Sequence, residues 1–204
     1  MLGVTANVLI DDCSDSDLVD KCLKGDSLRD SFASRTSFRH LYQRYQHKVR
    51  STLYQLCGPS LLDDLTQEVF LRVWKGLPKL KQQENFSTWL YRITWNVASD
   101  QRQAFGKQHS FDAELKNQAE INLVVVKEHT SELMQLHYQD LVQRGLQQLS
   151  FEHRSVLVLH DIEDIPQKEV AQILGLPTGT VKSRVFYARN AVRQFLQKEG
   201  VSEL

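Results

Sequence analysis

Apolar positions recur through most of the chain at the spacing of an amphipathic α-helix. The first clear stripe runs from Phe38 to Leu56, and Gly58-Pro59 is expected to end that helix. A second stripe follows between Asp63 and Gly76, where the leading carboxylates suit the positive end of a helix. No strand-like alternation longer than a few residues interrupts this pattern. The first half therefore predicts a bundle of helices.

A third helix is expected after the polar loop 79–85, with Ser87 or Thr88 as its N-terminal cap. The apolar pattern weakens from Gly106 to about Leu136, which is typical of a linker. A second helical block is expected from about Tyr138. We therefore expect an all-α fold of two small helical domains joined by a flexible linker. The expected divisions are a leading segment, a first domain, the linker and a second domain: 1–37, 38–107, 108–137 and 138–198.

Residues 166–196 read as two closely spaced helices with a glycine turn. Pro166 suits the first turn of a helix, and Gly175 can take the left-handed conformation that ends it. Leu176 is expected to fill the turn, and Thr178 to cap the next helix. Five positions then form one inner stripe: Val181, Val185, Ala188, Val192 and Phe195. This arrangement predicts a helix-turn-helix.

The opposite face of the second helix carries hydroxyls, aromatics and cations. These groups can reach base edges and phosphates in a DNA major groove. A helical hairpin with a solvated basic face is the alternative, but the short helix, glycine turn and basic face occurring together favour DNA binding. The candidate DNA contacts are Thr180, Lys182, Ser183, Arg184, Phe186, Tyr187 and Arg189.

Charge is unevenly distributed although its formal total is zero. Residues 31–62 carry five bases and no acid, and residues 166–198 carry six bases and one acid. Residues 1–30 and 108–165 are acidic. The basic segments can attract phosphate, and they can also be solvated helix faces. Acidic and basic segments could pair within the chain and mask the DNA-binding surfaces.

Several function classes find no support in the sequence. No apolar run approaches a membrane span, and the acidic N-terminus does not resemble a signal peptide, so a cytoplasmic location is expected. The three cysteines and seven histidines show no metal-ligand spacing. No phosphate loop or nucleophile elbow is present, so neither an enzyme nor a cofactor is expected.

Residues 86–100 interleave Trp89, Tyr91 and Trp95 with Arg92 and Asn96. Aromatic faces beside cations can hold unstacked bases of single-stranded DNA. The same aromatics can instead form core, and for Trp89 the core interpretation is favoured because it is in phase with Ile93.

The motifs, in this order and spacing, resemble a bacterial RNA polymerase sigma factor of the small, two-domain extracytoplasmic-function (ECF) type. The resemblance covers nearly the whole chain. The matching blocks are Asp17-Leu18-Val19 with Gly25-Asp26, Phe38–Arg50, 63–76, 86–100, and Gly179-Thr180-Val181-Lys182-Ser183-Arg184.

The resemblance implies a sigma factor that binds core polymerase, directs initiation at specific promoters and helps melt them. Its first domain, 38–107, would be region 2 and its helix-turn-helix, 138–198, region 4. The second helix of the first domain would dock on the clamp helices of the largest polymerase subunit through Asp64, Gln67, Glu68, Leu71 and Trp74. The loop and helix after it would read the melted minus-ten strand, with Asn96 capturing a flipped-out base and Lys79, Lys81, Arg92 and Arg102 holding the backbone. The basic face of the helix-turn-helix would read the minus-thirty-five element. The family also implies an anti-sigma factor as a regulatory partner.

Three features depart from the family pattern. Eleven Ser-rich residues, 27–37, stand where the family usually has only a few, and they are a candidate regulatory site. The loop 79–85 has no aromatic, and Tyr187 stands where a basic residue is common.

The alternative function is a stand-alone helix-turn-helix regulator, which would not need the acidic docking helix and aromatic helix of 63–100.

Overall fold

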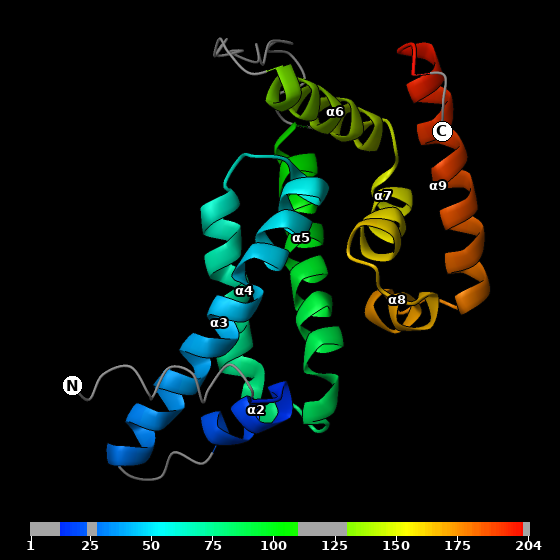
Figure 1. Cartoon of the computed structure of the whole chain (residues 1–204). Helices are drawn as coiled ribbons and strands as arrows, with labels where there is room; N and C mark the ends of the chain where they lie inside the picture. Colours follow the sequence, from blue (N-terminus) through cyan, green and yellow to red (C-terminus); the bar gives the residue numbers. More distant parts are fainter. Residues whose placement is uncertain (1–12, 24–27, 110–129, 202–204) are drawn as a thin grey trace. The chain divides into compact units, whose positions relative to one another are not determined.

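Every regular element in the described part of the chain is a helix. The computed structural model describes residues 13–23, 28–109 and 130–201, with the backbone alone for 28–31, 105–109 and 130–138. Contacts divide the chain into two compact units, one built mainly on α2–α5 and the other mainly on α6–α9. The all-α expectation is confirmed (Figure 1). None of the described helices is long and apolar enough to cross a membrane.

The first unit is a bundle of long helices. Figure 1 shows α3, α4 and α5 running alongside one another, with the short α2 packed on α3. Its core is made of fully buried aliphatic and aromatic side chains. The elements are α2 (Asp15–Leu23), α3 (Leu28–Cys57), α4 (Leu62–Gly76), the 3-10 turns η1 (Leu77–Lys79) and η2 (Gln83–Asn85), and α5 (Phe86–His109).

α2 is held against α3 by polar contacts as well as by its apolar face. Ser14 caps α2, because its hydroxyl accepts a hydrogen bond from the Asp17 N–H at 3.1 Å. Asp15 pairs with Arg44 at 2.5 Å and accepts a hydrogen bond from the Tyr45 hydroxyl. Burial and this carboxylate raise the pKa of Tyr45. Burial also raises the pKa of the Cys22 thiol to about 11, so this thiol is neutral at pH 7.

α3 begins ten residues earlier than the apolar stripe predicted. The Ser-rich stretch 27–37 lies largely within this helix, which starts at Leu28 instead of near Phe38. Ser34 is buried and its hydroxyl donates to the Cys22 carbonyl at 2.7 Å. A helix segment that is held by a polar hydrogen bond shows no apolar periodicity. The start of α3 was therefore not predicted from the sequence.

The connection between α4 and α5 is also more regular than expected. The polar loop 79–85 contains parts of η1 and η2, closed by the hydrogen bonds Leu80 N–H to Leu77 C=O at 3.0 Å and Asn85 N–H to Gln82 C=O at 3.1 Å. α5 begins at Phe86, so the prediction that Ser87 or Thr88 caps it is wrong. Phe86 is fully buried, so the first residue of α5 packs in the core.

The second unit contains the helix-turn-helix. Its elements are α6 (Thr130–Gln147), α7 (Phe151–Leu157), the π-helical turn η3 (Val158–Ile162), α8 (Gln167–Leu174) and α9 (Thr178–Lys198). α9 packs along α7 and, near its C-terminal end, against α6 (Figure 1). α6 starts eight residues before Tyr138, so the end of the expected linker is helical. Residues 110–129 of the expected linker lie outside the described residues.

The turn between α8 and α9 takes the form expected from its glycine. Gly175 has φ +66°, and the Leu176 N–H bonds back to the Ala171 carbonyl at 2.9 Å, which closes the end of α8. The predicted cap of α9 is wrong, because Thr178 is already helical and Pro177 is the cap residue. The Pro177 carbonyl accepts from the Thr180 N–H at 3.0 Å. Pro166 likewise precedes α8 and lies just outside it.

Candidate polymerase and nucleic-acid interfaces

A groove between α3 and α4 is a largely apolar open surface of the first unit. It measures about 470 Å³ and we call it the α3–α4 groove. Aromatic contacts define it: Phe38 meets Trp74 edge-on at 4.8 Å between centroids, and Tyr42 lies 4.5 Å from Phe70. It is lined by Phe38, Tyr42, Arg50, Asp63, Thr66, Gln67, Phe70, Leu71 and Trp74.

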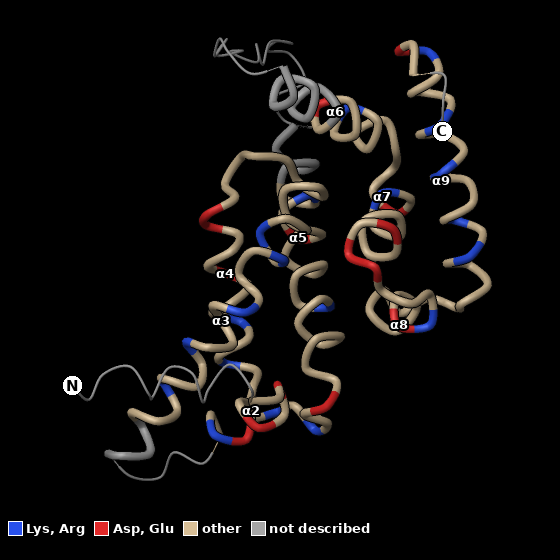
Figure 2. Tube along the Cα trace, viewed as in Figure 1, with Lys and Arg blue, Asp and Glu red and all other residues tan. Residues whose placement is uncertain are grey.

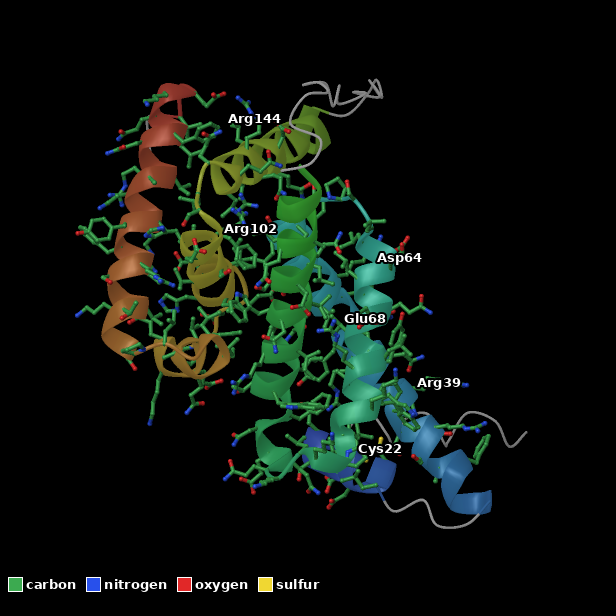
Figure 3. All side chains as sticks on the ribbon, turned by 180° about the vertical axis from the view of Figure 1, so that it is seen from behind. Cys22, Arg39, Asp64, Glu68, Arg102 and Arg144 are labelled. Atoms are coloured by element: carbon green, nitrogen blue, oxygen red, sulfur yellow. The ribbon has the colours of Figure 1, made fainter. Side chains whose placement is uncertain are left out.

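Three of the five predicted polymerase contacts line this groove: Gln67, Leu71 and Trp74. Leu71 and Trp74 remain 45% and 42% exposed, which is high for large apolar side chains. Asp64 and Glu68 lie one turn apart on α4, outside the lining (Figure 3). The Glu68 carboxylate accepts a hydrogen bond from Arg72 Nε at 2.7 Å. The five predicted polymerase contacts therefore comprise three residues that line an apolar groove and two acidic residues outside its lining.

The contribution of α3 to this groove was not predicted from the sequence. Phe38 begins the apolar stripe of α3 and Tyr42 follows it by one turn, at a spacing typical of core positions, but Tyr42 is 37% exposed. Arg50, also on α3, pairs with Asp63 at one end of the groove. Apolar residues at helical spacing can face either a core or a groove. Periodicity alone therefore does not separate these two environments.

Three of the five predicted minus-ten residues form a second, cationic surface around the start of α5. Lys79, Lys81 and Arg92 are exposed, and Trp89 beside them is half-buried. The loop before α5 is ordered by a hydrogen bond from Asn85 Nδ2 to Gln82 Oε1 at 2.6 Å. An aromatic face among cations suits a single strand of nucleic acid.

Asn96 and Arg102, the other two predicted residues, lie further along α5. Asn96 is exposed one turn beyond Arg92 on the same side of the helix, so its amide is open to solvent. Arg102 is ten residues from Arg92, or about 15 Å along the helix, and points to a different side. Trp89 is half-buried because it packs across Gly76, where an added Cβ would lie 2.8 Å from the indole ring. Tyr91 belongs to the core.

The outer face of α9 is the third surface. Its inner stripe is confirmed at Val181, Val185 and Ala188, which are buried. Phe186 and Tyr187 are 60% and 63% exposed and meet edge to face at 5.6 Å between centroids. Lysine and arginine recur along α9 (Figure 2), and both Lys182 and Ser183 are exposed.

Three predicted contacts on α9 are partly engaged within the protein. Thr180 and Arg184 are half-buried, and the Thr180 carbonyl accepts a hydrogen bond from the Ser183 hydroxyl at 3.0 Å. Arg189 donates two hydrogen bonds to Asp161, each at 2.7 Å. This pairing raises the pKa of Arg189. The described residues contain no group of three His, Cys, Asp or Glu side chains that could hold a metal ion.

Comparison with known families identifies both units. Residues 41–105 match the model of Sigma-70 region 2, and residues 145–194 match that of Sigma-70, region 4. The chain is 29% identical to the ECF RNA polymerase sigma-E factor of Escherichia coli K12, over 90% of this chain and 95% of that protein. It is 26% identical to the sigma-E factor of Haemophilus influenzae, over 90% and 96%.

Two solved structures share the fold. One is CnrH in complex with the cytosolic domain of CnrY, with a TM-score of 0.64, 22% identity, and coverage of 90% of this chain and 97% of that chain. The other is the sigma factor RpoE in complex with the anti-sigma factor NepR from Bartonella quintana, with a TM-score of 0.64, 22% identity, and coverage of 78% and 96%. With both regions matched in order and the relatives covered almost end to end, the chain belongs to the sigma-70 family and, within it, to the ECF sigma factors.

Proposed function

We propose that this ECF sigma factor divides its work among the three surfaces described above. The α3–α4 groove binds the clamp helices of the largest subunit of core RNA polymerase. The surface around the start of α5 reads the melted minus-ten strand, and α9 reads the minus-thirty-five element. The observation that carries the proposal is the combination in a single chain of one apolar groove beside acidic groups, one cationic surface beside the half-buried Trp89, and a second cationic surface with two exposed aromatics.

The docking step is supported by the chemistry of the groove. Trp74 and Leu71 supply apolar area that can be buried against a partner helix, and exposed aromatics of this kind dominate binding energies. Asp64 and Glu68 add negative charge beside the groove, which favours a partner with cations in the facing positions. A helix laid in a groove is a common mode of recognition between proteins.

The DNA-reading steps use different chemistry at the two ends of a promoter. Lys79, Lys81 and Arg92 hold the phosphates of a single strand, and the Asn96 amide can donate and accept at a base edge. On α9, Lys182 contacts phosphate while Phe186 and Tyr187 offer apolar contacts to base edges in the major groove. The chain itself carries out no bond chemistry, because RNA synthesis belongs to the polymerase in the cytoplasm.

An anti-sigma factor is part of this proposal. The two similar solved structures are complexes of CnrH with the cytosolic domain of CnrY and of RpoE with the anti-sigma factor NepR. A protein that covers exposed apolar and cationic surfaces would prevent both polymerase docking and premature DNA binding. The acidic and basic segments of the chain could also mask these surfaces by pairing with each other, and this idea is wrong if the free chain binds duplex promoter DNA as tightly as its complex with polymerase does.

The experiment is run-off transcription with purified core polymerase on a pooled library of genomic promoters, with and without this chain. We expect new, discrete start sites that share two spaced sequence motifs. The matched control replaces the chain with its Trp74→Ala variant, which should yield few of these transcripts. If no start site depends on the chain while it still binds duplex DNA alone, it is a stand-alone regulator and the proposal fails.

A further inference from the structure

A bidentate ion pair joins the turn after α7 to the outer helix α9. Arg189 donates from Nε and Nη2 to the two carboxylate oxygens of Asp161, with both distances 2.7 Å. Two parallel hydrogen bonds between planar groups fix orientation as well as distance. The Asp161 side chain is 25% exposed, and that of Arg189 is 52% exposed. The contact therefore lies at the edge of the surface that α9 presents to solvent.

The backbone holds Asp161 in place through an irregular turn. Asp161 belongs to the π-helical η3, which closes with a hydrogen bond from the Glu163 N–H to the Val158 carbonyl at 3.0 Å. Asp164 follows with φ +53°, and His160 Nδ1 contacts the Ile165 carbonyl at 2.8 Å. π-turns are costly and recur at functional sites. This turn is anchored on both sides, so the Asp161 carboxylate has little freedom to move.

Arg189 was expected from the sequence to contact DNA, but the pair changes its role. One N–H on Nε and one on Nη2 donate to Asp161, and a phosphate that approached the other three N–H groups of Arg189 would also meet the negative charge of this carboxylate. An unpaired carboxylate at this edge would repel DNA, whereas a paired one does not. The two side chains together link the η3 turn to the middle of α9 and neutralise each other.

We propose that Asp161 is a positioning residue for recognition of the minus-thirty-five element. It acts through Arg189, whose bidentate grip fixes α9 against the η3 turn and keeps the Arg189 guanidinium from acting as an independent phosphate contact. The inference rests on the proposed reading of that element by α9. A positioning role and a direct contact between Arg189 and phosphate predict different results in three measurements. These are the salt dependence of binding, the effect of a substitution that conserves charge, and the effect of the double substitution.

The test measures closed-complex formation by the holoenzyme on a promoter found in the run-off experiment, at low temperature and several salt concentrations. The variants are Asp161→Asn, Arg189→Gln, Arg189→Lys and the double variant Asp161→Asn with Arg189→Gln. We expect Asp161→Asn and Arg189→Gln each to weaken binding about two- to five-fold. The double variant should be no weaker than either single variant. The double variant removes one positive and one negative charge together, so its salt dependence should stay that of the wild type if no phosphate contact is lost.

Arg189→Lys separates the two roles even if Asp161→Asn weakens the turn itself. Lysine keeps the positive charge but lacks the planar fork, so the inference predicts a loss close to that of Arg189→Gln. A phosphate contact would survive this substitution. The inference is overturned if Arg189→Lys binds like wild type, or if the double variant lowers the slope of log affinity against log salt by about one.

Lys182→Gln is the control for the underlying assignment. Lys182 is exposed on α9 and has been proposed as a phosphate contact, so its substitution should lower that salt slope by about one. If it does not, α9 does not read the element and the proposed function of this helix fails. If it does, while Asp161→Asn tightens binding and the double variant shows additive effects, only the positioning role is wrong.

Discussion

Single side chains on α4 combine apolar bulk with exposure to solvent. Trp74 is 42% exposed although it contacts Phe38 at 4.8 Å, so about half of the indole is available to a partner. An exposed aromatic of this size at the rim of an apolar groove is the kind of residue on which binding energy concentrates. Its value to the protein therefore lies in binding more than in folding.

Replacing Trp74 with Ala should weaken binding to core polymerase by at least about tenfold, because the variant loses an anchor residue. The measurement is the affinity of labelled chain for core polymerase by fluorescence anisotropy. Tyr54→Ala is the matched control, since Tyr54 is an exposed aromatic on α3, 37% exposed, that does not line the groove. An equal loss in both variants would contradict the docking assignment.

Asn96 offers a separate test at the residue scale. Asn96→Ala should reduce promoter melting by about tenfold, because a base edge would lose its paired hydrogen bonds. Permanganate reactivity of unpaired thymines measures the melted complex, and anisotropy measures polymerase binding, which should not change. Gln103→Ala, at another exposed position on α5, is the control. If Asn96→Ala instead loses polymerase binding, its assigned role is wrong.

Among the elements, α8 and α9 show most directly how local sequence sets geometry. Gly175 ends α8 at φ +66°, a conformation in which an L side chain is strained. Gly179 lies in the first turn of α9, and an added Cβ there would meet nothing within 4 Å. The two glycines therefore have opposite requirements although they are only four residues apart.

Gly175→Ala should destabilise α8 and α9 by roughly 1–2 kcal/mol, because alanine does not tolerate a left-handed backbone. Gly179→Ala should stabilise α9 by up to about 1 kcal/mol, because alanine has the higher helix propensity. Native-state hydrogen exchange of the α8 and α9 amides measures both changes in opening free energy. Equal effects of the two substitutions would contradict the assigned backbone conformations.

The limits of helices were less predictable than their existence. Periodicity correctly indicated α4, α5 and the helix-turn-helix, since each buries one apolar face. Periodicity missed the start of α3, where the Ser34 hydroxyl donates a hydrogen bond to the Cys22 carbonyl. The expected N-terminal caps, Thr178 and either Ser87 or Thr88, instead lie within their helices. Helix ends depend on a few hydrogen bonds, whereas helix faces depend on many apolar positions.

The whole molecule is organised around two hydrophobic cores. Leu53 on α3 and Leu159 in η3 are both fully buried, one in each unit. Because each unit packs its own apolar side chains, damage to one core should remain in that unit. The two family models match residues 41–105 and 145–194, one nearer the N-terminus and one nearer the C-terminus of the chain.

Leu53→Ala and Leu159→Ala should each destabilise their own unit by about 2–5 kcal/mol. Hydrogen exchange over the whole chain would show faster opening of α3–α5 in the first variant and of α7–α9 in the second. Each variant serves as the control for the other. Faster exchange across both units in either variant would show that they unfold together.

The order of the helices, the helix-turn-helix and membership of the ECF sigma factors followed from the sequence, because apolar spacing, glycine turns and motifs are local properties of the chain. Only the tertiary structure decided that Phe38 and Tyr42 open into a groove beside Trp74, and that Arg189 is held by Asp161. These contacts join residues 28 or more positions apart in the chain. Such meetings depend on how whole helices pack, and no local pattern records them.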